Sequence, residues 1–181
     1  MLKKYIVFLL LLLSVALYAQ PRYVATIHPI KEILKNVVGE RGTVESVMPP
    51  GASPHTYEMK PTDIKRVNSA TALFSGDEHL DHWSHEFDNP NSIEIFHMIP
   101  HDFHLEIKNW FGRNKGKSLG EDPHFWTDPL TVKALLPNLV VKLTELDPQG
   151  KEQYNVNADN FAKELEALSN QTANALKQVQ G

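Results

Sequence analysis

Residues 23–48 read YVATIHPIKEILKNVVGERGTVESVM, and their pattern predicts the fold class. A short apolar run over residues 23–27 is followed by apolar side chains at helical spacing over residues 30–38, where Gly39 ends the helix. A second apolar run covers residues 43–48. A strand, a helix and a second strand in this order form the βαβ unit of a parallel sheet, so we predict an α/β fold.

The rest of the chain continues this alternation. Further strands are expected over residues 72–74 and 92–96, and further helices over residues 62–68, 77–87, 129–146 and 149–180. Thr62 or Asp63 is expected to cap the first of these helices. Asp128 is expected to cap the helix that follows it, with Pro129 at the first helical position.

One long loop and one long helix complete the predicted architecture. Residues 98–120 show little periodicity and are expected to form a loop of the kind that is usually functional or disordered. The last amphipathic pattern has neither glycine nor proline from residue 151 to residue 180, and it predicts a helix of about 45 Å. We therefore expect one parallel-sheet lobe with flanking helices over residues 20–147, followed by a long backbone helix over residues 148–181.

The N-terminus has the pattern of an export signal. Lys3 and Lys4 precede an apolar run over residues 5–17 that is short for a membrane span, and Ala19 is a small residue at the expected cleavage position. We predict a cleaved signal peptide over residues 1–19 and a periplasmic mature protein. The alternative is an uncleaved N-terminal anchor.

The composition removes several classes of site and partner. The chain contains no cysteine, which excludes disulfides, thiolate zinc sites and a lipid anchor attached to cysteine. The formal net charge is −4, and it becomes −6 without Lys3 and Lys4, which disfavours nucleic acid as a partner. Any metal must therefore be held by histidine, carboxylate or water.

Two histidines lie in short loops rich in proline. His55 lies in PPGASPHTYE, residues 49–58, and His124 lies in EDPHFWTDP, residues 121–129. Because proline fixes its own φ and restricts the residue before it, these imidazoles are held in defined directions. Each follows a predicted strand, and ligands gather at the carboxyl ends of strands in an open α/β sheet. The pair is a candidate half of a metal site, and the alternative is that each ring simply hydrogen-bonds to the backbone.

Several neighbours are candidates for supporting such a site. Neutral imidazole is a good ligand for Zn²⁺, and its second nitrogen usually bonds to a carboxylate or a carbonyl. Glu58, Asp122 and Asp128 are the local carboxylates for that role. His28, at the end of the first predicted strand, either lines the same crevice or caps the following helix.

The remaining histidines form two groups: His79, His82 and His85, and then His97, His101 and His104. The first group is spaced by three residues on one predicted helix, where a solvated polar face is favoured over a metal site. The second group lies in or beside the expected long loop. It forms either a weak auxiliary metal site or an ordinary polar loop.

These motifs resemble the periplasmic metal-binding proteins of ABC transporters for zinc and manganese. The matching segments are residues 24–30, 50–58, 61–63 and 122–129, together with Leu146, Asp147, Pro148, Tyr154, Asn157, Ala158 and Phe161. The resemblance covers essentially all of residues 23–181. The two histidine motifs are specific together, because they occur in this order and at this spacing.

The resemblance implies two α/β lobes joined by one rigid helix, with the metal held between them. It implies that His55 and His124 are the ligands of the first lobe and that the second lobe adds a histidine or carboxylate and an acidic residue. The chain is expected to end with the linking helix, so the second lobe and its two ligands are missing. We therefore expect weaker metal binding than in a two-lobed relative.

The function implied by the resemblance is capture of a divalent metal ion outside the cytoplasm, with zinc favoured over manganese, for delivery to the membrane permease of an ABC transporter. No enzymatic activity is implied. Affinity is expected to fall around pH 6–7, because protonated imidazole cannot bind metal. Two alternatives stay open: a zinc-dependent hydrolase with His55 and His124 as ligands and Asp122 as base, and a surface adhesin or other binding module on the same fold.

Overall fold

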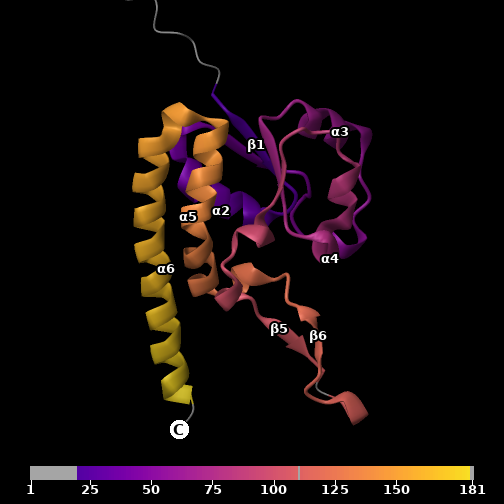
Figure 1. Cartoon of the computed structure of the whole chain (residues 1–181), viewed down its shortest axis with the longest axis vertical. Helices are drawn as coiled ribbons and strands as arrows, with labels where there is room; N and C mark the ends of the chain where they lie inside the picture. The colour runs from indigo at the N-terminus through magenta and orange to yellow at the C-terminus, as the bar shows by residue number, and fades with distance from the viewer. Residues whose placement is uncertain (1–19, 110, 180–181) are drawn as a thin grey trace, which may run out of the picture.

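The computed structural model describes residues 20–109 and 111–179, and the predicted signal peptide, residues 1–19, lies outside them. A four-stranded parallel sheet in the order β2-β1-β3-β4 forms the centre of the lobe (Figure 1). Its strands are β1 (Arg22–Ala25), β2 (Thr43–Ser46), β3 (Ala72–Ser75) and β4 (Ser92–Glu94). The predicted α/β lobe with a parallel sheet is therefore confirmed.

β1 lies in the middle of the sheet because its side chains are apolar on both faces. Tyr23, Val24 and Ala25 are fully buried. Tyr23 is paired with Val44 of β2 on one side and with Ala72 of β3 on the other. Strands that are covered on both faces carry continuous apolar runs rather than alternating ones, which is the pattern of this segment.

Helices cover both sides of the sheet. They are α2 (His28–Val38), α3 (Pro61–Asn68), α4 (Glu78–Asp81), α5 (Pro129–Leu146) and α6 (Lys151–Val179). In Figure 1, α2, α5 and α6 lie on one side of β1, and α3 and α4 lie on the other. Among the residues described, no helix is both long and apolar enough to cross a membrane.

Short 3₁₀ turns connect these elements. They are η1 (Gly39–Arg41), η2 (Pro54–Thr56), η3 (His82–Glu86), η4 (Ile95–Met98), η5 (His101–Phe103), η6 (Gly112–Asn114), η7 (Phe125–Thr127) and η8 (Pro148–Gly150). Three of them matter for the candidate site, since η2 carries one of its histidines, η3 packs behind that histidine and η7 follows the other.

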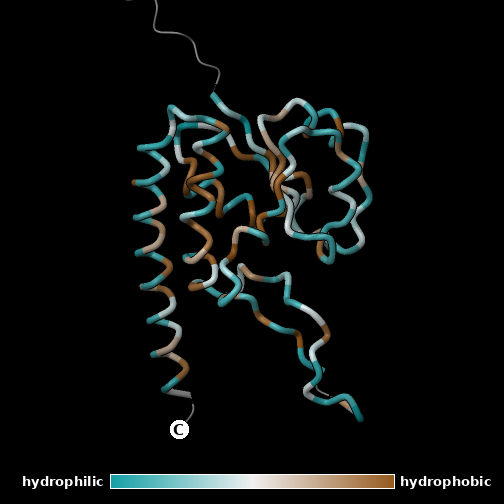
Figure 2. The backbone as a smooth tube through the Cα atoms, viewed as in Figure 1, coloured by the Kyte–Doolittle hydropathy of each residue, from teal (hydrophilic) through white to brown (hydrophobic). Residues whose placement is uncertain are grey.

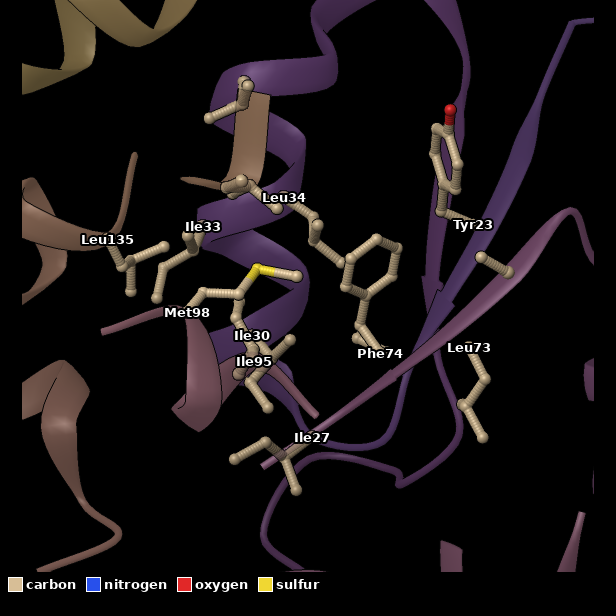
Figure 3. Packing of buried hydrophobic residues seen from close by; sticks show 14 of the residues in the cluster. Tyr23, Ile27, Ile30, Ile33, Leu34, Leu73, Phe74, Ile95, Met98 and Leu135 are labelled. Carbon is tan, nitrogen blue, oxygen red and sulfur yellow. The ribbon is translucent and has the colours of Figure 1, made fainter. Parts of the chain in front are cut away.

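The core is built where α2 meets the sheet. Figure 3 shows Leu34 of α2 beside Phe74 of β3, and Ile33 of the same helix facing Leu135 of α5. The spacing of three and four residues puts the α2 side chains on one face of the helix. Burying each such side chain stabilises the fold by roughly 1.5–3 kcal/mol, so this face fixes the position of α2.

α5 begins and ends where its sequence signals lie. The Asp128 carboxylate accepts hydrogen bonds from the backbone N–H groups of Leu130 and Thr131, at 3.1 and 3.2 Å, and Pro129 occupies the first helical position. The helix ends at Leu146, directly before Asp147. Both predicted boundaries are confirmed.

A polar network attaches the start of α6 to the lobe. Arg41 donates two hydrogen bonds to Asp147, of 2.6 and 2.7 Å, and the Tyr154 hydroxyl donates a third to the same carboxylate at 2.7 Å. One turn further along α6, the side-chain amide of Asn157 donates to the carbonyl oxygen of Val37 at 2.9 Å. These contacts join α6 to the end of α2.

The C-terminal half of α6 has no apolar cover within the part of the chain described. Leu165 is buried, whereas Leu168 and Leu176 are 49% and 56% exposed. Figure 1 shows α6 extending past α5 toward the C-terminus. At 29 residues the helix spans roughly 43 Å. Helices in proteins draw most of their stability from packing. The N-terminal half of α6 is therefore expected to be more stable than its C-terminal half.

The prediction of one long loop over residues 98–120 is wrong in part. β5 (Glu106–Lys108) and β6 (Ser118–Glu121) pair as an antiparallel ribbon that projects away from the sheet (Figure 1). The turn between them contains Asn109, Gly112, Asn114 and Gly116, which is the composition of a hairpin connection. The sequence does not reveal these strands because three or four residues are too few to show a periodicity.

The predicted helix over residues 77–87 is shorter than expected. Asp77 caps α4, but α4 ends at Asp81 and continues as η3. The buried Asp81 carboxylate accepts the backbone N–H of Gly76 at 2.9 Å and the hydroxyl proton of Thr26, which holds Asp81 outside helical geometry. A side chain that bonds back to the backbone in this way competes with the helix.

The predicted cap of α3 is also wrong. Lys60 is the N-cap, because Pro61 occupies the first helical position and the cap must precede it. Asp63 lies at the third helical position and accepts the backbone N–H of Lys60 at 2.9 Å. Thr62 lies at the second helical position, directly after Pro61.

Candidate metal centre

The imidazole rings of His55 and His124 lie side by side. Their centroids are 5.8 Å apart and their planes are inclined by 59°. His55 is exposed on η2, and His124 is partly buried between β6 and η7. The structure therefore brings together the two histidines that the sequence singles out, from loops far apart in the chain.

The two histidines reach this point by different routes. His55 lies in the loop that follows β2 of the parallel sheet, as expected. His124 follows β6, which belongs to the antiparallel ribbon and not to the parallel sheet. Its position depends instead on Phe125, which is buried and lies edge-on to Phe96 with ring centroids 6.4 Å apart. The rule about strand ends thus accounts for His55 alone.

The separation of the rings suits two ligands of one ion. A histidine nitrogen binds zinc at about 2.0–2.1 Å, so two imidazoles on one tetrahedral ion have centroids roughly 5–6 Å apart. The observed 5.8 Å lies in that range.

Asp122 orients the ring of His124. Its Oδ1 atom lies 2.7 Å from Nδ1 of His124 and also accepts the backbone N–H of His124 at 3.0 Å. Partial burial opposes ionisation of Asp122, but these two hydrogen bonds and the charge of the imidazole outweigh it and lower the pKa of the carboxyl group. A carboxylate on Nδ1 leaves Nε2 of the same ring free for a metal.

Trp83 supports the loop that carries His55. The indole Nε1–H donates a hydrogen bond of 2.8 Å to the carbonyl oxygen of Pro54, the residue before His55. Trp83 is itself buried and packs edge-on against Phe87, with ring centroids 6.1 Å apart. The position of η2 is therefore fixed from the core of the lobe.

Tyr57 supports the same loop from its other end. Its ring lies 4.9 Å from that of Trp83, and its hydroxyl donates a hydrogen bond of 2.8 Å to Asp63. Burial and the Asp63 carboxylate together raise the pKa of Tyr57 to about 12. Arg66 donates to the other oxygen of Asp63 at 2.7 Å. His55 thus lies between two anchored positions, residues 54 and 57.

A small cavity lies beside the histidine pair. It has a volume of about 250 Å³ and is lined by Ile27, His28, Pro29, Met48, Pro49, Pro50, Gly51, Ala52, Pro54 and Trp126. Trp126 also lies edge-on to His124, with ring centroids 5.4 Å apart. His28 begins α2, lines this cavity and lies 3.7 Å from Glu32, so it borders the crevice next to the pair.

The other candidate carboxylates have different positions. The Asp128 side chain caps α5 through its hydrogen bonds to the helix backbone. Glu58 is exposed in the loop that follows η2. Of the three carboxylates proposed as partners of the imidazoles, Asp122 is the one seen in contact with a histidine of the pair.

The described residues place no third ligand beside the pair. Within residues 20–109 and 111–179, no group of three or more histidine, cysteine, aspartate or glutamate side chains is arranged to hold a metal ion. The pair therefore provides two imidazoles and leaves the remaining coordination positions to water or to groups outside this arrangement.

The histidines outside the pair mostly lie beside carboxylates, and His104 also forms hydrogen bonds. His97 and His85 lie 2.8 and 3.4 Å from the two oxygens of Glu94. His104 bonds through Nδ1 to Glu121 at 2.8 Å and through Nε2 to the carbonyl oxygen of Ile99 at 3.1 Å. The His104 hydrogen bond lowers the pKa of Glu121. With both nitrogens occupied, His104 is the ring least available to a metal.

His101 stacks on His104 with ring centroids 5.2 Å apart and planes inclined by 9°. In the other group of histidines, His79, His82 and His85 are all exposed, while Leu80 and Trp83 on the opposite side are buried. That arrangement is the solvated polar face that the sequence favours.

The chain matches the family described as zinc-uptake complex component A, periplasmic, over residues 24–181. It is 30% identical over 152 residues to the iron-binding protein YfeA of Yersinia pestis, covering 81% of this chain and 46% of that protein. It is 28% identical over 148 residues to the metal ABC transporter substrate-binding lipoprotein SloC of Streptococcus mutans, covering 80% of this chain and 48% of that protein. The chain thus spans about half the length of these curated relatives.

A solved structure shows the same fold. The solute-binding protein FpvC of Pseudomonas aeruginosa, in complex with Mn²⁺, superposes with a TM-score of 0.70 at 27% identity, covering 87% of this chain and 56% of that protein. These relatives are named as binding proteins and not as enzymes, in agreement with the expectation from the sequence. SloC is named as a lipoprotein, so the comparison does not support the expectation that a lipid anchor is excluded. With nearly all of its described residues matched, the chain belongs to the zinc-uptake component A family of metal-binding proteins of ABC transporters.

Proposed function

We propose that this chain forms a metal-capturing lobe of a periplasmic solute-binding protein, with His55 and His124 as direct ligands of a divalent metal ion. The observation that carries the proposal is the 5.8 Å separation of the two imidazole rings. The role of Asp122 supports it, because a carboxylate on Nδ1 directs the other nitrogen of His124 outward. The metal is the transported substrate and not a resident cofactor.

Zinc is the favoured metal. Two neutral imidazoles are good ligands for Zn²⁺, whereas Mn²⁺ prefers carboxylate, carbonyl and water oxygens. The family description names zinc, while YfeA is named as iron-binding and FpvC as a manganese complex. The preference for zinc therefore rests on the chemistry of the described ligands of this lobe.

The partner of the loaded lobe would be the permease of an ABC transporter. SloC is named as the substrate-binding component of such a transporter, and that name supports the same partner for this chain. Delivery requires that the ion be released again. Two protein ligands with water in the remaining positions favour exchange over permanent retention.

Calorimetric titration with Zn²⁺ and Mn²⁺ at neutral pH tests this function. We expect one zinc site whose affinity falls strongly in His55→Ala and His124→Ala and is lost in the double variant, with weaker binding of Mn²⁺. His82→Ala is the matched control, since His82 is exposed on η3 in the other histidine group. Tight stoichiometric zinc binding that survives the double substitution would reject the proposal.

A further inference from the structure

The β5–β6 ribbon exposes several large apolar side chains. Leu105, Ile107 and Leu119 are 49%, 39% and 62% exposed, and Phe111 in the turn is 84% exposed. Figure 1 shows the ribbon standing away from the sheet, and Figure 2 shows hydrophobic positions along it. Apolar side chains gathered on one projecting element, without cover from the described residues, mark a surface that contacts something else.

The same ribbon concentrates positive charge at its tip. Residues 107–120 contain Lys108, Arg113, Lys115 and Lys117 and no aspartate or glutamate. None of these four cations forms an ion pair with another described residue. The acidic residues Glu106 and Glu121 lie at the base, nearest the lobe. The chain as a whole has a formal net charge of −4, so the positively charged tip is opposite in sign to the rest of the protein.

The tip has a defined backbone. Asn109 donates its N–H to the carbonyl oxygen of Lys117 at 2.9 Å, and Gly116 donates to the carbonyl oxygen of Asn109 at 2.7 Å. The Asn109 side chain accepts the N–H of Phe111 at 2.9 Å. Gly116 has a φ of +85°, which favours glycine in this turn. Phe111 is therefore exposed in a hairpin whose turn is closed by backbone hydrogen bonds.

We propose that the β5–β6 ribbon docks this lobe on an anionic lipid surface. The Phe111 ring and the leucines would enter the interface between headgroups and acyl chains, and the four cations would contact lipid phosphates. Apolar side chains flanked by lysine and arginine are the composition of segments that lie in a membrane interface. Lysine stems can cover apolar surface while their ammonium groups reach the phosphates.

A lipid surface suits these observations better than a second copy of the chain. Two copies that met through their ribbon tips would place like charges together, which disfavours the contact. The rest of the chain is acidic and would be repelled by an anionic membrane. The positively charged ribbon is therefore the part of the lobe expected to contact the lipid. β6 leads within three residues to His124, so docking by the ribbon would bring the histidine loops near the membrane.

Vesicle sedimentation tests the proposal. The chain from Gln20 onward is used, because it is the expected mature protein and contains the described buried core, Tyr23 to Leu165. We expect it to sediment with vesicles of phosphatidylcholine and phosphatidylglycerol, to bind pure phosphatidylcholine more weakly, and to be released by high salt. Lys115→Gln with Lys117→Gln is expected to weaken binding roughly 25-fold. Phe111→Ser is expected to weaken it roughly tenfold.

The matched control is Lys35→Gln with Lys163→Gln, which removes two exposed lysines away from the ribbon and is expected to leave binding unchanged. Equal binding to both vesicle types, an equal loss in the control, or dimerisation that depends on Phe111 in place of vesicle binding would each overturn the proposal. None of these substitutions touches His55 or His124. The zinc titration is therefore expected to be the same in all of them, and the two proposals fail independently.

Discussion

The Oδ1 atom of Asp122 lies 2.7 Å from Nδ1 of His124 and 3.0 Å from the backbone nitrogen of the same residue. One carboxylate oxygen thus fixes both the backbone of the loop and the direction of the imidazole ring. Because groups behind a metal ligand set its tautomer and orientation, the carboxylate is expected to contribute to affinity without touching the metal.

Replacement of this carboxylate tests its positioning role. We expect Asp122→Ala to lower the affinity for zinc by about 10- to 100-fold, measured by calorimetric titration. Asp122→Asn keeps an oxygen that can accept the Nδ1–H, and it is expected to fall between the wild type and the alanine variant. Asp88→Ala, at an exposed aspartate on another loop, serves as the control. Equal affinity in Asp122→Ala and wild type would contradict the assignment.

Trp83 provides a second test, at a residue that supports His55 from the core. Trp83→Phe removes the Nε1–H that bonds to Pro54 and is expected to lower the free energy of unfolding by about 1–2 kcal/mol. Zinc affinity is also expected to fall, because the position of η2 becomes less defined. Phe87→Leu disturbs the same aromatic packing without touching the loop. If the two variants lower zinc affinity equally, the hydrogen bond has no special role.

The fold is predictable from sequence where a local signal marks each boundary. Gly39 marks the end of the first helical pattern, and Asp128 and Pro129 mark the start of α5; all three signals lie within two residues of the observed ends. The sequence also predicts that His55 and His124 lie close together, on the assumption that both follow strands of one sheet. In the structure, His124 is positioned instead by the burial of the neighbouring Phe125.

Two kinds of feature cannot be predicted from the sequence: contacts between residues far apart in the chain, and very short helices and strands. The bond from Trp83 to the Pro54 carbonyl joins positions 29 residues apart and leaves no local pattern. The loss of helix after α4 depends on Asp81, whose carboxylate bonds to Thr26 in another element. Burial raises the pKa of this Asp81 carboxyl group, whereas the sequence predicts a solvated aspartate on a helix face.

The pairing of Arg41 with Asp147 predicts a dependence of stability on pH. The Arg41 hydrogen bonds, aided by that of Tyr154, lower the pKa of Asp147 below its ordinary value near 3.8. A depressed folded-state pKa contributes stability that is present above the unfolded pKa and is lost as the pH falls through the folded value. We therefore expect Asp147→Asn to lower the free energy of urea unfolding by about 1–3 kcal/mol at pH 7.

The difference between Asp147→Asn and the wild type is expected to shrink as the pH falls below about 4, because the wild-type carboxylate becomes protonated and loses its ion pair with Arg41. Glu166→Gln is the matched control, since Glu166 pairs with Lys133 on the exposed surface. Surface pairs contribute little, so its effect is expected to be small. A difference between the Asp147 variant and wild type that is constant from pH 7 to pH 3 would contradict the assignment.

Gly150 occupies a position that has no room for a side chain. A Cβ atom there would lie 2.4 Å from Cζ of Tyr154 and 2.7 Å from Oδ2 of Asp147. Gly150→Ala is therefore expected to lower the free energy of unfolding by about 1–3 kcal/mol through overpacking. Gly51 is the informative comparison, since it has a φ of +83° and a Cβ atom added there would meet no other atom within 4 Å. Gly51→Ala is expected to cost only about 1 kcal/mol.

The uneven burial of α6 predicts uneven protection of its backbone. Tyr154, Ala158 and Leu165 are buried against the lobe, whereas the described side chains beyond Leu165 are largely exposed. Amide hydrogen exchange measured by NMR is expected to be slow from Tyr154 to Leu165 and to quicken toward Leu176, because local opening there breaks few packing contacts. The measurement requires a sample shown to be monomeric. Uniformly slow exchange along α6 in such a sample would mean that its C-terminal half is stabilised by something other than packing on this lobe.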